Sequence, residues 1–166
     1  MKKTIIDLFE DSVVKYGAKT FLLEKKHRAF EPTTYAETKE QALEIGAGLA
    51  AAGIRPGDKV AILSEGCNAW ITSELGVFYA GAVSVPLSVK LEESNDLLFR
   101  MRHAEVRALF VSKYQLSKIR RIRAELPQVE HIIVIGHIPL EAGETALGTL
   151  RRMGRDYLAA NREEFL

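Results

Sequence analysis

The sequence is poor in cysteine, in excess charge of either sign and in long apolar runs. Its one cysteine, Cys67, leaves no pair for an internal disulfide, so a disulfide-stabilised fold is excluded and a reducing compartment is the simplest location. A formal net charge of +1 over 166 residues gives no reason to expect binding to nucleic acid or to an anionic membrane surface. The longest uncharged run, residues 75–89, contains Gly81 and Pro86 and is shorter than the roughly 20 residues of a membrane-spanning helix. We therefore expect a cytoplasmic globular protein with no transmembrane segment.

Most sequence motifs that carry chemistry are also missing. There is no G-x-x-x-x-G-K-[ST] phosphate loop, no G-x-S-x-G nucleophile elbow and no pair of cysteines at zinc-ligand spacing. The histidines are His27, His103, His131 and His137, and none of them forms a metal-spaced pair with another. We therefore predict no metal site in this chain and assign no catalytic residue to it.

One glycine motif is present, but its surroundings argue against a cofactor. Residues 46–51, GAGLAA, fit the G-x-G-x-x-[G/A] fingerprint of NAD- and FAD-binding folds, which requires a strand directly before it. Residues 34–37, Thr-Tyr-Ala-Glu, form a capping box that begins a helix instead. Apolar residues then recur at helical spacing, at Ala42, Ile45, Leu49 and Ala52. Gly46 and Gly48 therefore lie inside a helix, where we expect them to allow close approach of a neighbouring helix.

The rest of the chain alternates between strands and helices. A helix from Ile5 to Tyr16 is followed by two short strands, at 20–24 and 29–33, which predict a β-hairpin. Further strands are expected at 60–63, 82–86, 108–111 and 131–135, and helices at 68–80, 92–103, 115–126 and 147–166. Such alternation with short connections predicts an α/β fold: a mostly parallel sheet with helices on both faces, plus the N-terminal hairpin.

A basic cluster follows the strand expected at 108–111. Its members are Lys113, Lys118, Arg120, Arg121 and Arg123. Apolar residues at 116, 119 and 122 occupy the inward face of the helix, so most of these charges are expected to point outward. Two interpretations remain open. The basic residues form either a solvated helix face or a phosphate site. The phosphate site is considered because the loop after a parallel strand is where α/β sheets bind ligands.

Residues 34–87 carry a resemblance to a known family. The specific parts are TYAE at 34–37, RPGDKVA at 55–61 and AGAVSVPL at 80–87. Their order and separations are similar to those of the N-terminal region of adenylate-forming enzymes, the superfamily of acyl-CoA synthetases, luciferases and adenylation domains. The resemblance extends from about Ile5 to Ile135. Within the superfamily, the tail with Leu150, Gly154, Tyr157 and Leu158 resembles bacterial long-chain fatty-acid–CoA ligases.

The resemblance implies an enzyme that activates a fatty acid with ATP and Mg²⁺ to an acyl-adenylate and transfers the acyl group to coenzyme A (CoA). The phosphate loop and the C-terminal domain of such enzymes are absent from residues 1–166, which are expected to form a single partial domain, the N-terminal subdomain of the ligase fold. We therefore expect no ligase activity from this chain alone and no tightly bound cofactor. Lys118, Arg120 and Arg121 are the residues that the resemblance suggests for a CoA phosphate in the intact enzyme.

Two alternatives stay open at this point. The chain resembles other acyl or aminoacyl adenylating enzymes as well, and a stand-alone, non-catalytic α/β binding module would share its secondary structure. In the ligase interpretation, fatty acid and CoA bind through the rest of the parent chain, and nucleic acid is not a partner. Membrane association of the intact enzyme remains open. Self-association is expected through the apolar face that the remainder of a larger enzyme would cover.

Overall fold

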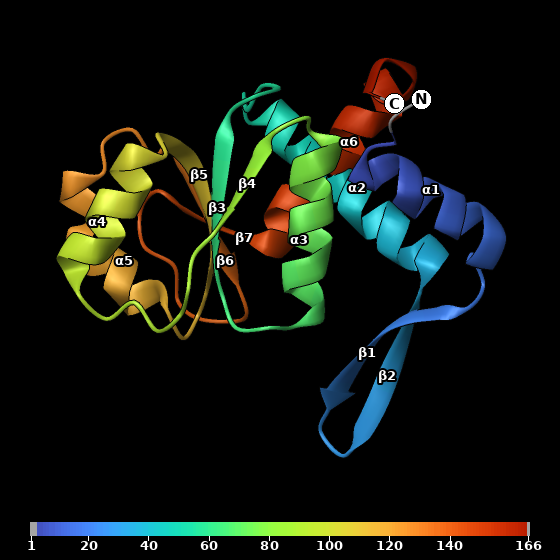
Figure 1. The fold of residues 1–166 in the computed structure, drawn as a ribbon, viewed down its shortest axis with the longest axis horizontal. Helices are drawn as coiled ribbons and strands as arrows, with labels where there is room; N and C mark the ends of the chain where they lie inside the picture. The colour runs from blue at the N-terminus through green and yellow to red at the C-terminus, as the bar shows by residue number, and fades with distance from the viewer. Residues whose placement is uncertain (1–2, 166) are drawn as a thin grey trace.

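The structure, a computed structural model, describes residues 3–165 of the chain. Its elements are α1 (Ile5–Tyr16), β1 (Thr20–Lys26), β2 (Ala29–Thr34), α2 (Tyr35–Ala51), β3 (Lys59–Leu63), α3 (Asn68–Tyr79), β4 (Val83–Pro86), α4 (Ser94–His103), β5 (Val106–Ser112), α5 (Leu116–Ile122), a 3₁₀ turn (Arg123–Glu125), β6 (His131–Ile135), β7 (Glu144–Ala146) and α6 (Leu147–Phe165). Figure 1 shows the sheet between two groups of helices, with the hairpin of β1 and β2 projecting from one end.

Five parallel strands form the sheet, in the order β4-β3-β5-β6-β7, and β1 pairs with β2 in a separate antiparallel hairpin. Helices α2, α3 and α6 supply the core on one face of the sheet, and α4 and α5 supply the core on the other. The α/β fold with a parallel sheet, helices on both faces and an N-terminal hairpin is therefore confirmed.

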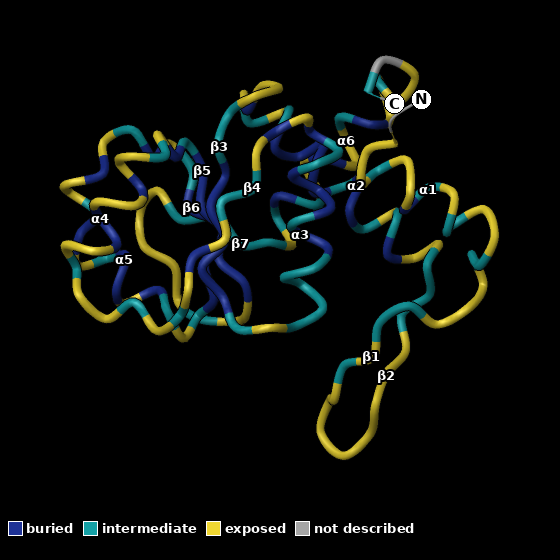
Figure 2. Tube along the Cα trace, in the orientation of Figure 1, coloured by how far each residue is buried: buried dark blue, intermediate teal, exposed yellow. Residues whose placement is uncertain are grey.

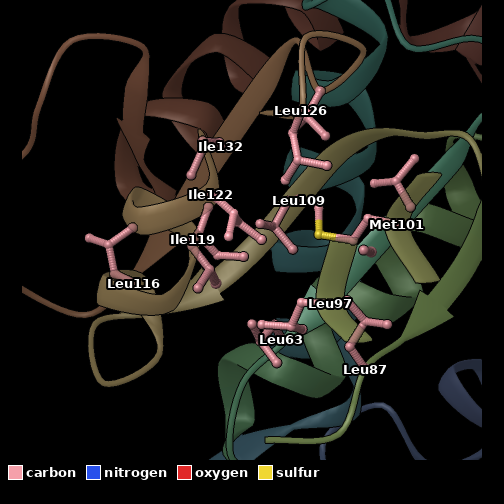
Figure 3. Packing of buried hydrophobic residues seen from close by; sticks show 14 of the residues in the cluster. Leu63, Leu87, Leu97, Met101, Leu109, Leu116, Ile119, Ile122, Leu126 and Ile132 are labelled. Carbon is pink, nitrogen blue, oxygen red and sulfur yellow. The ribbon is translucent and has the colours of Figure 1, made fainter. Parts of the chain in front are cut away.

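The strands are buried on both faces, as their apolar runs predict. In β3, Val60 and Ile62 face α2 and α3, whereas Ala61 and Leu63 face α4 and α5. Figure 3 shows the second of these cores, in which Leu63 and Leu109 of the sheet meet Leu97 and other side chains of the covering helices. Side chains alternate across a strand, so one short strand contributes to two cores.

The capping box at the start of α2 forms as predicted. The Glu37 backbone N–H donates to the Thr34 hydroxyl at 3.2 Å, and the Thr34 backbone N–H donates to the Glu37 carboxylate at 2.7 Å. Two of the free backbone groups that begin every helix are satisfied in this way. The helix therefore begins before the glycine motif, and Gly46 and Gly48 lie within it.

Several details differ from the sequence-based expectation; among them, β1 extends to Lys26 and β5 begins at Val106. The helix expected at 115–126 is shorter: it ends at Ile122, whose φ of −109° and ψ of 4° leave α-helical geometry, and the 3₁₀ turn Arg123–Glu125 follows. Helix α4 starts two residues later than expected, with Glu93 as its N-cap. Strand β7 was not predicted, since its three residues contain no apolar run and it exists by pairing with β6, Ile132 opposite Glu144. The expected end of the last helix, Leu166, lies outside the described residues.

Helix α2 contacts α3 and α6 at glycines. A Cβ on Gly48 would lie 2.4 Å from the Leu150 carbonyl oxygen of α6, and one on Gly46 would lie 2.7 Å from the Gly76 carbonyl oxygen of α3. On the other side of the α2–α6 contact, a Cβ on Gly154 would lie 1.7 Å from the Glu44 carbonyl oxygen. The glycines of GAGLAA therefore serve helix packing, as the capping box predicted.

The substitution Gly154→Ala should lower the free energy of unfolding by about 2–3 kcal/mol, because the added methyl group overlaps backbone that cannot rotate away. Gly148→Ala in the same helix is the matched control, since nothing lies within 4 Å of its Cβ position. Alanine favours helix over glycine by about 0.5–1 kcal/mol, so the control should be neutral or stabilising. Urea unfolding followed by circular dichroism measures both, and equal stabilities of the two variants would contradict the packing interpretation.

Candidate functional site

The carboxyl ends of the parallel strands meet at one edge of the sheet. After β3 the chain passes to α3 on one face, and after β5 it passes to α5 on the opposite face. The point between two strands whose connections diverge in this way is where open α/β sheets place their ligands. The candidate site is therefore this edge, and its segments, residues 64–67, 87–93 and 113–118, are here named the carboxyl-edge rim.

Lys118 of α5 is held inside this rim. Its Nζ donates to the carbonyl oxygens of Val89 and Leu91, at 2.9 and 3.0 Å, and to the Glu92 carboxylate at 2.8 Å. The residue is 8% exposed. The expectation of a solvated helix face is thus wrong for Lys118, because its flexible stem carries the ammonium group back to the loop after β4.

Gln115 joins the same rim to the loop after β3. Its Nε2 donates to the Glu65 carboxylate at 2.5 Å and so joins the segments that follow the paired strands β3 and β5. Burial pushes the pKa of Glu65 upward, but the hydrogen bond from Gln115 and the nearby charge of Lys118 act against it, and the pKa lies below its usual value. The carbonyl oxygen of the Gln115 side chain is buried and has no hydrogen-bond partner among residues 3–165.

Arg120 points away from Lys118. It donates two hydrogen bonds to the Glu144 carboxylate, at 2.8 and 2.7 Å, and a third to the Pro139 carbonyl oxygen. Arg121 is exposed, and its side chain makes no hydrogen bond or ion pair with another residue in the described part of the chain. The structure therefore does not bring the three predicted CoA-phosphate residues to one point: Lys118 holds one loop, Arg120 holds another and Arg121 faces solvent.

Sequence reasoning missed the partners of these basic residues. Gln115 and Glu65 are 50 positions apart, Lys118 and Glu92 are 26 apart, and Arg120 and Glu144 are 24 apart. Charge alone does not predict which carboxylate pairs with a given basic residue over such separations, because many carboxylates are available. The one usable signal was the strand predicted at 60–63, because Glu65 lies two residues after its carboxyl end.

A second polar cluster lines a cavity of about 660 Å³ beside α1. The Tyr79 hydroxyl and the Lys39 ammonium group both donate to the Glu10 carboxylate, at 2.5 and 2.6 Å. Burial, together with the bond to Glu10, raises the pKa of Tyr79 far above its usual value. Tyr79 therefore stays neutral, and the cluster fastens α1 to α2 and α3 instead of supplying a base or nucleophile.

The residues that the structure describes offer no metal centre. Among positions 3–165 there is no group of three or more His, Cys, Asp or Glu side chains able to hold a metal ion. Cys67 is a half-buried free thiol. None of the helices over the same positions has both the length and the apolar character needed to cross a membrane.

Arg120→Met should lower the free energy of unfolding at pH 7 by about 1–3 kcal/mol, because it leaves the buried Glu144 carboxylate without its cation. Arg120 now holds the pKa of Glu144 below its usual value. The stability gained from this depressed pKa is present above the unfolded-state pKa of about 4.3 and is lost as the pH falls through the lower folded value. The cost of the substitution should therefore stay constant from pH 7 to about pH 5 and shrink as the pH falls below about 4.3.

Urea unfolding at several pH values measures this dependence. Arg121→Met, in the same helix and exposed, is the control and should change stability by less than about 0.5 kcal/mol at every pH. A cost of Arg120→Met that is independent of pH would contradict an electrostatic role for the pair.

Comparison with known proteins places this geometry among ligases. A long-chain-fatty-acid–CoA ligase of Thermus thermophilus is 29% identical over 145 residues, which are 86% of this chain and 27% of the relative. The chloroplastic long-chain-fatty-acid–[acyl-carrier-protein] ligase of Arabidopsis thaliana is 28% identical over 109 residues, 66% of this chain and 15% of the relative. The chain thus spans well under a third of the length of either curated relative.

Solved structures of CoA ligases are similar to this chain in fold. The anthranilate CoA ligase AuaEII, in complex with anthranoyl-AMP, superposes with a TM-score of 0.81 at 28% identity, over 89% of this chain and 27% of that one. A long-chain-fatty-acid–CoA ligase from Archaeoglobus fulgidus has a TM-score of 0.79 over 93% of this chain and 30% of its own, and its 18% identity supports the fold alone. The AMP-binding enzyme family matches residues 9–160. The chain therefore belongs to the AMP-binding enzyme family, whose relatives here are acyl- and aryl-CoA ligases.

Proposed function

We propose that this chain is the N-terminal scaffold segment of an ATP-dependent ligase that joins a long-chain fatty acid to CoA through an acyl-adenylate. The family match over residues 9–160 is the observation that supports the ligase class. The fatty-acid substrate is supported by the Thermus thermophilus relative, which matches 86% of this chain. A second candidate is activation of another acid, favoured by the similarity to the anthranilate ligase at a TM-score of 0.81.

The chemistry of the proposed reaction belongs to other parts of the enzyme. Adenylation requires donors and a metal that hold a transferring phosphate in line with the attacking carboxylate. Residues 3–165 contain no cluster that fits Mg²⁺, and residues 1–166 contain no phosphate loop. We therefore propose that they form a single partial domain whose role is to position the remaining parts, with ATP and Mg²⁺ bound elsewhere in the longer protein.

The basic cluster at α5 is proposed to lie near a CoA phosphate in that longer protein. Arg121 is the member best placed to contact the phosphate directly, since its side chain is exposed while Lys118 and Arg120 are engaged by carbonyl and carboxylate oxygens. The near-neutral charge of the chain supports no nucleic-acid partner. The free thiol of Cys67 fits a reducing, cytoplasmic location.

Exposed apolar side chains support a proposal of self-association when the chain is isolated. Leu23 and Phe30, 61% and 65% exposed, lie on the hairpin that projects from the body, and Leu8 of α1 is 54% exposed. Figure 2 shows the far half of the hairpin as a continuous exposed segment. A two-stranded hairpin alone is marginally stable in water, so these side chains favour contact with another surface.

The isolated chain should therefore form dimers or larger species at high micromolar concentration, measured by light scattering. Replacing Leu23 and Phe30 together by serine should shift the distribution toward monomer. Leu140→Ser, at a loop position that is 42% exposed, is the control and should leave the distribution unchanged. A wild-type chain that stays monomeric and binds no hydrophobic dye would rule the proposal out.

The 166-residue chain should release no pyrophosphate from ATP in the presence of palmitate, Mg²⁺ and CoA, whereas the full-length protein should. The reason is that residues 3–165 hold no metal-binding cluster and residues 1–166 no phosphate loop to stabilise the charge that develops on the transferring phosphate. Both proteins are assayed side by side, with anthranilate as a second acid. Turnover by the chain alone would refute the scaffold role, and a full-length protein inactive with every fatty acid would refute the fatty-acid assignment.

A further inference from the structure

The start of α5 is tied to two loops that follow other strands. Gln115 donates to Glu65, in the loop after β3, and Lys118 donates to Val89 and its neighbours, in the loop after β4. Helix α5 itself follows β5. One short helix therefore connects the segments that leave the carboxyl ends of three adjacent strands, which lie in the order β4-β3-β5.

Lys118 has no donor left for a ligand. An ammonium group has three N–H donors, and here the acceptors are two carbonyl oxygens and the Glu92 carboxylate, all within 3.0 Å of Nζ. A cation that is 8% exposed is stable in the fold only while such acceptors surround it. Lys118 and the loop after β4 therefore fix each other, and a phosphate could bind Nζ only by displacing one of these bonds.

The Gln115 side chain lies at the point on the sheet edge where a ligand would be expected. Its amide group bridges to Glu65 between the ends of β3 and β5, the point at which the connections diverge. The carbonyl oxygen of the same side chain is buried and unpaired among residues 3–165. Since this oxygen has no donor among these residues, the amide group is held at this point by its hydrogen bond to Glu65.

We propose that Gln115 and Lys118 are positioning residues. They hold the loops after β3 and β4 in the shape in which the ligase binds its substrates, and Lys118 acts through these loops without touching the CoA phosphate itself. The inference rests on the ligase activity proposed above, but the amide hydrogen exchange of the loops can be measured independently of that activity.

Amide hydrogen exchange on the 166-residue chain tests the loop directly. In Lys118→Met, exchange at residues 87–93 should be at least about tenfold faster, with residues 131–135 of β6 unchanged. Arg121→Met in the same helix is the control and should leave both segments as in wild type. If Lys118→Met does not fold, Glu92→Gln, at an exposed carboxylate that is one of the three acceptors, should raise exchange in the same segment by a smaller factor. Unchanged exchange at 87–93 overturns the proposal.

Steady-state kinetics of the full-length ligase separate positioning from direct binding. Lys118→Met should raise the KM for CoA and for 3′-dephospho-CoA by the same factor, about 5–20-fold, with kcat changed less than about twofold. Lys118→Arg should not restore the wild-type KM, because a planar guanidinium cannot reach three acceptors gathered around one nitrogen. Gln115→Leu should also raise the KM for CoA and the KM for 3′-dephospho-CoA by one common factor.

The outcomes are distinct. A KM increase confined to CoA, or full rescue by Lys118→Arg, shows direct phosphate binding and overturns the proposal. A full-length protein that makes no acyl-CoA from any acid refutes the proposed function, and the exchange measurement then decides alone whether Lys118 holds the loop.

Discussion

The close approach of α2 to α3 and α6 is the constraint on which the rest of the fold depends. At Gly48 and Gly154 the backbones of α2 and α6 meet with no room for a methyl group, and Gly46 meets α3 in the same way. These contacts make three helices into one layer over one face of the sheet. The opposite face is covered separately by α4 and α5, so the connections after β3 and β5 must leave toward different sides. The diverging connections, and with them the candidate site, follow from that division.

The candidate site is defined by loops and not by reactive groups. At the carboxyl edge the buried cation of Lys118 and the Gln115 amide group both donate hydrogen bonds that hold neighbouring segments in place. Tyr79, at the other polar cluster, is kept neutral by burial and by its bond to Glu10, which raises the pKa of its hydroxyl. The described residues thus hold loops in place, as the proposed scaffold role requires.

The sequence allowed most of the fold to be predicted, because its signals are local. The capping box at Thr34 set the start of α2, and apolar runs such as 60–63 marked strands buried on both faces. Strand β7 had no such signal, since it depends on pairing with β6 and on the bond from Arg120 to Glu144. The candidate site was harder to predict, because its contacts also join residues that lie far apart in the sequence. A basic residue such as Lys118 has no sequence feature that distinguishes a solvated charge from one buried against distant carbonyl groups.

We propose that this chain is the scaffold segment of a longer adenylate-forming ligase. The genomic sequence immediately downstream of the codon for Leu166 tests it most directly. The open reading frame should continue and soon encode a loop rich in serine, threonine and glycine and ending in Pro-Lys-Gly, because such a loop supplies the phosphate contacts that residues 1–166 lack. A stop codon directly after Leu166, in a transcript that is translated as such, would contradict it.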